Sequence, residues 1–160
     1  MVDRVERARE YAIAAHGEQR YGNHPYAYHL AAVVKILAEA GASDDMIIAG
    51  WLHDVVEDTD ATEADIAAAF GEEVAGLVGA VSGGGNRDAH VAAIYEKIKA
   101  LPAGATVKLA DRIANIEAAT PGDRHSLRYA REHPGFAEVI EPHAPPSLWK
   151  RYMAALAASC

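Results

Sequence analysis

The stretch from Trp51 to Asp58 combines apolar residues with four side chains able to bind a metal or move a proton, namely His53, Asp54, Glu57 and Asp58. His53 lies four residues before Glu57, a spacing that places both on one face of a helix. The same spacing joins Asp54 to Asp58. His53 and Asp54 are adjacent and would point about 100° apart on a helix, so both could reach one ion beside it. A bound cation would remove the cost of burying such groups; the alternative is an exposed helix end with ordinary carboxylates.

A metal site needs further ligands, and two residues outside this stretch are candidates. His29 lies early in a predicted helix, where a lone histidine is more often structural. Asp111 lies in another predicted helix, on one face with Asn115. For a single acid at that position, a surface pair with Lys108 or Arg112 is the default alternative.

In combination, these residues resemble a known family. A distant His, a His-Asp pair and a distant Asp form the pattern of the HD-domain phosphohydrolases. The fuller pattern is similar to the hydrolase domain of the RelA/SpoT alarmone enzymes and their small stand-alone relatives, in the same order over about Ala8 to Ala118. The matching segments are His16-Gly17-Glu18-Gln19-Arg20, Pro25-Tyr26-Ala27-Tyr28-His29, Leu52-His53-Asp54-Val55-Val56-Glu57-Asp58-Thr59, Phe70-Gly71-Glu72-Glu73-Val74 and Lys108-Leu109-Ala110-Asp111-Arg112-Ile113-Ala114-Asn115.

The resemblance implies a site for one divalent metal ion, commonly manganese in this family. Its ligands would be His29, His53, Asp54 and Asp111. Two imidazoles and two carboxylates form a mixed set, and by their chemistry alone they also permit Fe, Zn or Co.

The resemblance also implies roles around that metal. Glu57 and Asp58 match the pair that positions or deprotonates the attacking water. Asn115 matches a residue that lines the nucleotide site, and Arg20 matches a substrate contact. Lys108 could join Arg20 in offsetting phosphate charge.

The chain departs from the alarmone pattern next to Arg20. Tyr21 and Gly22 follow directly, so the segment is one residue shorter and lacks the lysine of the base site. Ala118 stands where the long alarmone enzymes usually carry a hydroxyl. These differences leave the predicted metal ligands in place and predict weaker discrimination among purine bases.

Composition excludes several classes of protein. The net charge of -8, with no Lys or Arg from Ile36 to Asn86, argues against binding long nucleic acid. The sequence has no apolar run long enough to span a bilayer, and its charged N-terminus lacks a signal core. The single cysteine, Cys160, allows no intrachain disulfide, which is typical of a cytoplasmic protein. Because the charge argues against long nucleic acid and no run spans a bilayer, we expect this protein to act on a small molecule.

Apolar periodicity and turn residues predict a chain of helices without strands. A Gly-rich segment, Ser82 to Asn86, is interpreted as a linker, with a mobile rim of the cleft as the alternative. The proline-containing tail is expected to be broken into short pieces, with Tyr129 and His133 at a surface helix end. The predicted helices cover about Asp3–Arg20, Tyr26–Ala40, a buried central helix after Ser43 that contains Met46 to Val56, Thr62–Gly71, Glu72–Val81, Asp88–Ala100, Ala105–Ala119 and Ser147–Ala158.

Together, these observations predict an all-α, single-domain HD bundle over residues 1–160, with a motif-bearing core of about 8–118 and a helical tail of 119–160. The expected reaction is metal-dependent hydrolysis of a phosphorylated nucleotide, foremost the 3′-pyrophosphate of a (p)ppGpp-like alarmone. A phosphomonoesterase acting on another nucleotide or NADPH is one alternative, and a non-catalytic, metal-bound nucleotide sensor is another. The oligomeric state stays open.

Overall fold

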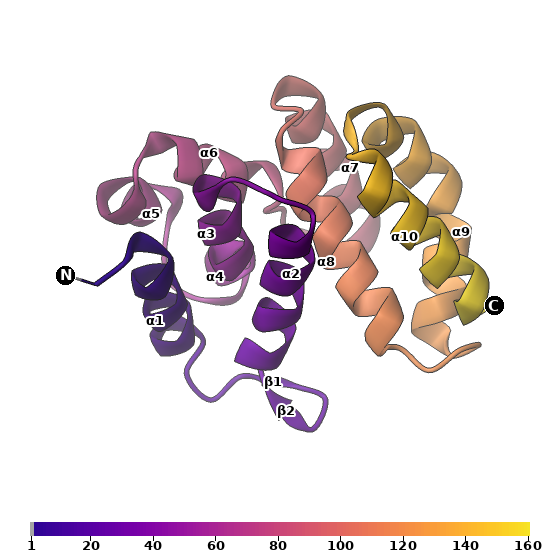
Figure 1. Ribbon diagram of the computed structural model, residues 1–160, viewed down its shortest axis with the longest axis horizontal. Helices are drawn as coiled ribbons and strands as arrows, with labels where there is room; N and C mark the ends of the chain where they lie inside the picture. The colour runs from indigo at the N-terminus through magenta and orange to yellow at the C-terminus, as the bar shows by residue number, and fades with distance from the viewer. Residues whose placement is uncertain (1) are drawn as a thin grey trace.

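Helices make up nearly all of the secondary structure in the computed structural model, which describes residues 2–160 (Figure 1). The all-α prediction is confirmed. Among the described residues, no helix is both long and apolar enough to cross a membrane. In chain order the elements are α1 (Arg4–His16), β1 (Arg20–Tyr21), β2 (His24–Pro25), α2 (Ala27–Glu39), α3 (Asp44–Leu52), α4 (Val55–Asp58), α5 (Glu63–Phe70), α6 (Glu72–Ala80), α7 (Arg87–Ala100), α8 (Gly104–Ala118), α9 (Arg124–Ile140), the 3-10 helix η1 (Glu141–His143) and α10 (Pro146–Ser159).

Helices α2 and α8 join two apolar cores. One core is formed with α1, α3, α5 and α6, and the other with α7, α9 and α10. Leu30 of α2 and Val107 of α8 pack in the first core, whereas Leu37 and Ile113 of the same helices pack in the second. The predicted central helix, α3, is buried, but α8 occupies the middle of the molecule between the two sets of helices (Figure 1).

A glycine allows α2 and α3 to approach closely. A Cβ atom at Gly50 would lie only 2.7 Å from Cδ1 of Leu37 and 3.3 Å from Cγ2 of Val34. Such contacts are closer than a packed core tolerates, so a larger residue at this position would force the Leu37 side chain or the helices to shift. The close packing holds the C-terminal end of α3, and His53 behind it, against the helix that carries His29.

Two predicted helices end earlier in the structure than the sequence pattern indicated. Helix α1 stops at His16, because Gly17 takes a left-handed φ of 54° and the chain then enters the short antiparallel hairpin β1–β2, which was not predicted. The helix after Ser43 stops at Leu52 and restarts as α4, so its predicted continuity through His53 and Asp54 is wrong. The predicted caps at Ser43 and Thr62 are present, and Thr62 forms a complete capping box.

The C-terminal segment is more regular than predicted. Helix α9 runs for 17 residues straight through Pro134, so the expectation of short pieces is wrong. Proline removes one helical hydrogen bond, but burial of Phe136 and Ile140 in the second core outweighs that loss. Tyr129 is buried and Nδ1 of His133 pairs with the hydroxyl of Tyr152 at 2.8 Å, so neither lies at a surface helix end.

Candidate active site

Three separate parts of the chain bring four potential metal ligands together. His29 comes from α2, His53 and Asp54 from the turn between α3 and α4, and Asp111 from α8. One ligand atom of each lies within 4.8 Å of the others. Nε2 of His29 is 3.1 Å from Oδ1 of Asp111, and Nε2 of His53 is 3.0 Å from Oδ2 of Asp54. A single divalent ion could contact all four groups.

The turn that interrupts the helix fixes the protonation of His53. Nδ1 of His53 lies 2.7 Å from the carbonyl of Gly50, the group that a continuing helix would pair with the amide of Asp54. Because a carbonyl only accepts, Nδ1 must donate, and Nε2 is the ring atom that can bind a metal once it has lost its proton. Nε2 of His53 is buried and makes no hydrogen bond of good geometry, although Oδ2 of Asp54 lies 3.0 Å away. A buried atom of this kind calls for a partner, and a cation fits the chemistry of the donor set.

The cluster strongly favours positive charge at its centre. Burial lowers the pKa of His53, but Asp54 and Asp111 raise it more, so this pKa lies well above its ordinary value. Burial raises the pKa of Asp111, yet Lys108 and His29 together with His53 hold it well below the usual range. The carboxyl groups therefore stay ionised and available to a metal ion.

Polar neighbours hold the two carboxylates in place. The hydroxyl of Tyr26 donates to Oδ2 of Asp54 at 2.6 Å. Nζ of Lys108 donates to Oδ2 of Asp111 at 3.0 Å, and Nδ2 of Asn115 donates to Oδ1 at the same distance. The predicted surface pair of Asp111 and Lys108 thus exists, but Asp111 is buried among the candidate ligands. Such outer contacts orient ligands and tune their affinity.

Glu57 lies beside the Gly-rich loop. Its Oε1 accepts a hydrogen bond from the Gly83 amide at 2.8 Å and lies 3.6 Å from Nε2 of His90. Burial raises the pKa of Glu57 to about 7, against the opposing effect of the Gly83 hydrogen bond. The loop from Ser82 to Asn86 is therefore not a plain linker, because it borders this carboxylate.

The other predicted site residues have different surroundings. Asp58 is exposed and accepts from Nε2 of Gln19 at 3.0 Å, so it does not share the contacts of Glu57. Arg20 is also exposed and donates to the carbonyl of Asn23 at 2.7 Å within the hairpin. The structure thus joins Lys108 and Asn115 directly to the cluster and leaves Arg20 on the hairpin surface.

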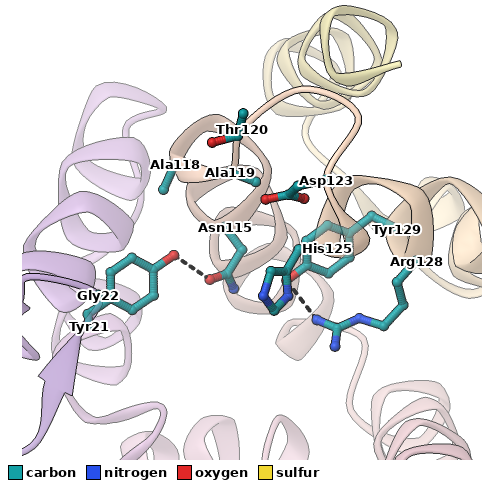
Figure 2. Close-up of a pocket in the computed structure, with 10 residues that line it drawn as sticks. All are labelled: Tyr21, Gly22, Asn115, Ala118, Ala119, Thr120, Asp123, His125, Arg128 and Tyr129. Carbon is teal, nitrogen blue, oxygen red and sulfur yellow. Dashed lines mark hydrogen bonds between the residues drawn. The ribbon is translucent and has the colours of Figure 1, made fainter.

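A cavity of about 390 Å³ opens beside the cluster. Figure 2 shows the residues that line it. On one side the hydroxyl of Tyr21 donates to Oδ1 of Asn115 at 2.8 Å, and the Tyr21 ring stacks on His29 with 4.7 Å between centroids. Side chains of α9 form the opposite side. The lining residues are Tyr21, Gly22, Asn115, Ala118, Ala119, Thr120, Asp123, His125, Arg128 and Tyr129.

Sequence reasoning missed several residues around this site. Tyr26 lies three residues before His29 in a motif that was noted, and that spacing was the available signal. Tyr21 was noted only as a substitute for a lysine, although its ring and hydroxyl join the cavity to the cluster. For Gly83 and His90 no sequence signal was available, because loop geometry alone places them at Glu57.

Comparison with protein families gives one match that covers most of the chain. The family described as HD domain matches residues 8–135. A guanosine-3′,5′-bis(diphosphate) 3′-pyrophosphohydrolase of Aquifex aeolicus is 38% identical over 122 residues, which are 72% of this chain and 18% of that protein. A GTP pyrophosphokinase of Streptomyces coelicolor is 32% identical over 149 residues, covering 88% of this chain and 17% of that protein. The chain thus spans less than a fifth of the length of these relatives.

Solved structures show the same fold. A metazoan ortholog of SpoT, described as hydrolysing ppGpp, superposes with a TM-score of 0.82 at 24% identity, over 98% of this chain and 96% of that chain. A Listeria monocytogenes protein superposes with a TM-score of 0.60 at 27% identity, over 80% of this chain and 90% of that one. The first likeness extends to nearly the full length of both chains.

Proposed function

This chain belongs to the HD domain family, and we propose that it is a metal-dependent phosphohydrolase acting on a phosphorylated nucleotide. The leading substrate is a (p)ppGpp-like alarmone, cleaved at its 3′-pyrophosphate. The observation that carries the proposal is the His₂Asp₂ cluster, whose four ligand atoms lie within 4.8 Å of one another. The names of the relatives from Aquifex aeolicus and of the metazoan structure support the choice of substrate.

The proposed cofactor is one divalent metal ion, with Mn²⁺ as the first choice. His29, His53, Asp54 and Asp111 would hold it. When bound, such an ion supplies Lewis-acid polarisation of a phosphoryl oxygen and of the attacking water.

Glu57 is the proposed general base. Its half-buried carboxylate has a pKa of about 7, so near neutral pH it can exist ionised and accept a proton from water. The Gly83 amide holds one carboxylate oxygen and thereby fixes its direction. For Asp58, which Gln19 holds at the surface, we propose the lesser role of orienting water at the edge of the site.

We propose that the nucleotide occupies the cavity beside the cluster. Asn115 would line it, since its side chain touches both Tyr21 and Asp111. Lys108 lies at the cluster and would offset phosphate charge. Arg20 would have to leave the carbonyl of Asn23 to reach the substrate, which suits a contact made only on binding.

One feature favours a second candidate substrate. Tyr21 presents an aromatic ring and a hydroxyl already paired with Asn115, where the alarmone enzymes have a base-site lysine. Stacking on a ring accepts any purine, so a phosphomonoesterase acting on NADPH or another nucleotide is the alternative. A non-catalytic sensor is a weaker candidate, because binding alone does not require a carboxylate placed like Glu57.

Two further proposals concern the whole chain. We propose that residues 1–160 act as one domain, and the shared helices α2 and α8 support this, since each contributes to both cores. We also propose a cytoplasmic location, which the lone exposed cysteine, Cys160, supports.

The direct test is pyrophosphate release from ppGpp by the purified chain, stripped of metal and then supplied with Mn²⁺. We expect turnover only with metal. Glu57→Gln should slow it by roughly 100-fold or more while metal binding stays unchanged. Glu96→Gln, at an exposed site on α7 where the native carboxylate pairs with Lys99, is the matched control and should behave as wild type. Tight ppGpp binding without release of any product would contradict the enzyme and favour the sensor.

A further inference from the structure

His90, near the start of α7, lies against the carboxylate of Glu57. Its Nε2 is 3.6 Å from Oε1, the same oxygen that accepts from the Gly83 amide. About a fifth of each side chain is exposed, 20% for His90 and 19% for Glu57. The pair therefore connects the proposed base to solvent on the side where the loop passes.

Gly83 sets the distance between these two groups. A Cβ atom at this position would lie 3.0 Å from the carbonyl oxygen of His90 and 3.1 Å from its Nδ1. The loop backbone thus packs directly on the imidazole while its amide holds Glu57. The amide of His90 also donates to the carbonyl of Asn86 at 2.9 Å, which ties the end of the loop to α7.

We propose that His90 receives the proton that Glu57 takes from the attacking water and passes it to solvent. This inference rests on the proposed role of Glu57 as base. As the water oxygen bonds to phosphorus and the phosphorus–oxygen bond to the nucleoside breaks, Glu57 gains one proton, and the departing nucleoside oxygen takes one from bulk water to leave as a hydroxyl. That proton then moves to Nε2 of the neutral imidazole. The imidazolium releases it to bulk water, and both residues return to their starting states. His90 acts through Glu57 and is therefore a positioning residue.

Surrounding charges suit this role. Burial, Lys108 of α8 and Arg87 of α7 lower the pKa of His90, so its imidazole is neutral and able to accept at neutral pH. Asp54 and Asp111 act in the opposite sense.

Two further charged groups lie nearby and are already paired. Glu132 of α9 forms a salt bridge with Arg87, and Lys97 of α7 donates to the carbonyl of Ser82. Their charges are therefore engaged elsewhere, and Glu57 is the carboxylate that faces His90.

The kinetic test compares His90→Gln with His143→Gln, a matched substitution at an exposed site on η1. For His90→Gln we expect kcat to fall about tenfold, less than the roughly 100-fold expected for loss of the base, with KM unchanged. Imidazole added to the solution should restore most of the lost rate, because it can take the proton from Glu57. His143→Gln should keep the wild-type rate. An unchanged kcat in His90→Gln, or a loss that imidazole does not restore, would overturn the relay.

A second measurement needs no turnover. The imidazole of His90 can be titrated by NMR in the metal-free wild-type chain and in Glu57→Gln. Because the pKa of Glu57 is about 7, its ionisation should shift the ring resonances of His90 near neutral pH in the wild-type chain. Glu57→Gln should remove that step from the His90 signal, and His143 should not show it in either chain. A wild-type His90 signal without this step would overturn the contact. If the wild-type chain hydrolyses nothing, the proposed function fails and the relay fails with it; if hydrolysis proceeds and either readout is unaffected, only the relay fails.

Discussion

Two clusters of charged side chains lie on different faces of α8, and their buried charges are paired differently. In the first, Asp54 and Asp111 face the imidazoles of His29 and His53, and a buried nitrogen is left without a partner. In the second, Glu132 of α9 is surrounded by cations: it accepts bidentate hydrogen bonds from Arg87 and one from Arg112. The guanidinium of Arg112 also lies over the rings of Tyr129 and Phe136, 4.7 and 4.3 Å from their centroids.

The difference separates a candidate binding site from a structural cluster. The arginines around Glu132 pair with its carboxylate and tie α7, α8 and α9 together, although Nη1 of Arg112 and Nε of Arg128 are buried without a hydrogen bond. The ligand cluster is complete only with an added positive charge, which a proton on His53 or a metal ion can provide. Neighbouring residues of one helix, Asp111 and Arg112, serve the two clusters separately because they point about 100° apart on α8.

The largest expected effect concerns the cluster of candidate metal ligands around His53. His53→Ala should weaken metal binding beyond the roughly 10–100-fold typical of outer-shell partners. We expect about 1000-fold, or about 4 kcal/mol. Metal content per chain and the rise in Tm on adding Mn²⁺ measure this effect, with His143→Ala as the control. Equal metal content in His53→Ala and His143→Ala would show that the cluster around His53 does not hold the metal.

The cluster around Glu132 should respond in the opposite way. Glu132→Ala leaves the buried guanidinium of Arg112 without its carboxylate, so we expect the free energy of unfolding to fall by about 3 kcal/mol. Metal affinity should stay at the wild-type value. Denaturant unfolding checks the first expectation and metal titration the second, against Glu138→Ala at an exposed site of the same helix. A large loss of metal affinity in Glu132→Ala would show that the clusters are coupled.

The pH dependence of turnover tests the edge of the metal cluster. Burial raises the pKa of Glu57 to about 7, and the base must be ionised to accept a proton. Turnover should therefore fall about tenfold per pH unit below about 7 and level off above it. The residual activity of Glu57→Gln should lack this dependence. A rate for the wild-type chain that is flat from about pH 5.5 to 8 would exclude Glu57 as the base.

A smaller effect is expected at the hairpin. Arg20 contacts only the Asn23 carbonyl in its present position, so Arg20→Ala should leave stability unchanged and raise KM by about three- to tenfold. Steady-state kinetics with ppGpp measure this change in KM. Arg131→Ala, at an exposed site of α9, is the control. Equal KM values would show that phosphate binding depends on other cations.

The smallest effect concerns the purine base. The cavity extends from Asn115 beside the metal cluster to Arg128 beside Glu132, and Tyr21 offers a ring in place of a lysine. We expect kcat/KM for ppGpp and its adenosine counterpart to agree within about tenfold, because a site without a dedicated hydrogen-bonding partner rejects analogues weakly. A much stronger preference for ppGpp would identify another base contact, and phosphate release from NADPH alone would favour the phosphomonoesterase.

Much of the molecule follows from the sequence. Helix periodicity, the caps at Ser43 and Thr62 and the composition together predict an all-α fold, because these signals depend on neighbouring residues. The residues grouped by the cluster were also predicted, although only the family resemblance linked His29 and Asp111 to His53 and Asp54. Their role as ligands stays a prediction.

Contacts between distant segments were decided only by the tertiary structure. Helix α3 breaks before His53 because the side chain takes over a backbone acceptor, and α9 continues through Pro134 because its apolar face is buried. The same holds for the approach of Gly83 and His90 to Glu57, and for the pairing of Arg112 with Glu132 rather than Asp111. Local patterns specify which residues can form a helix, but burial and partners from elsewhere in the chain determine where each helix ends and which charges meet.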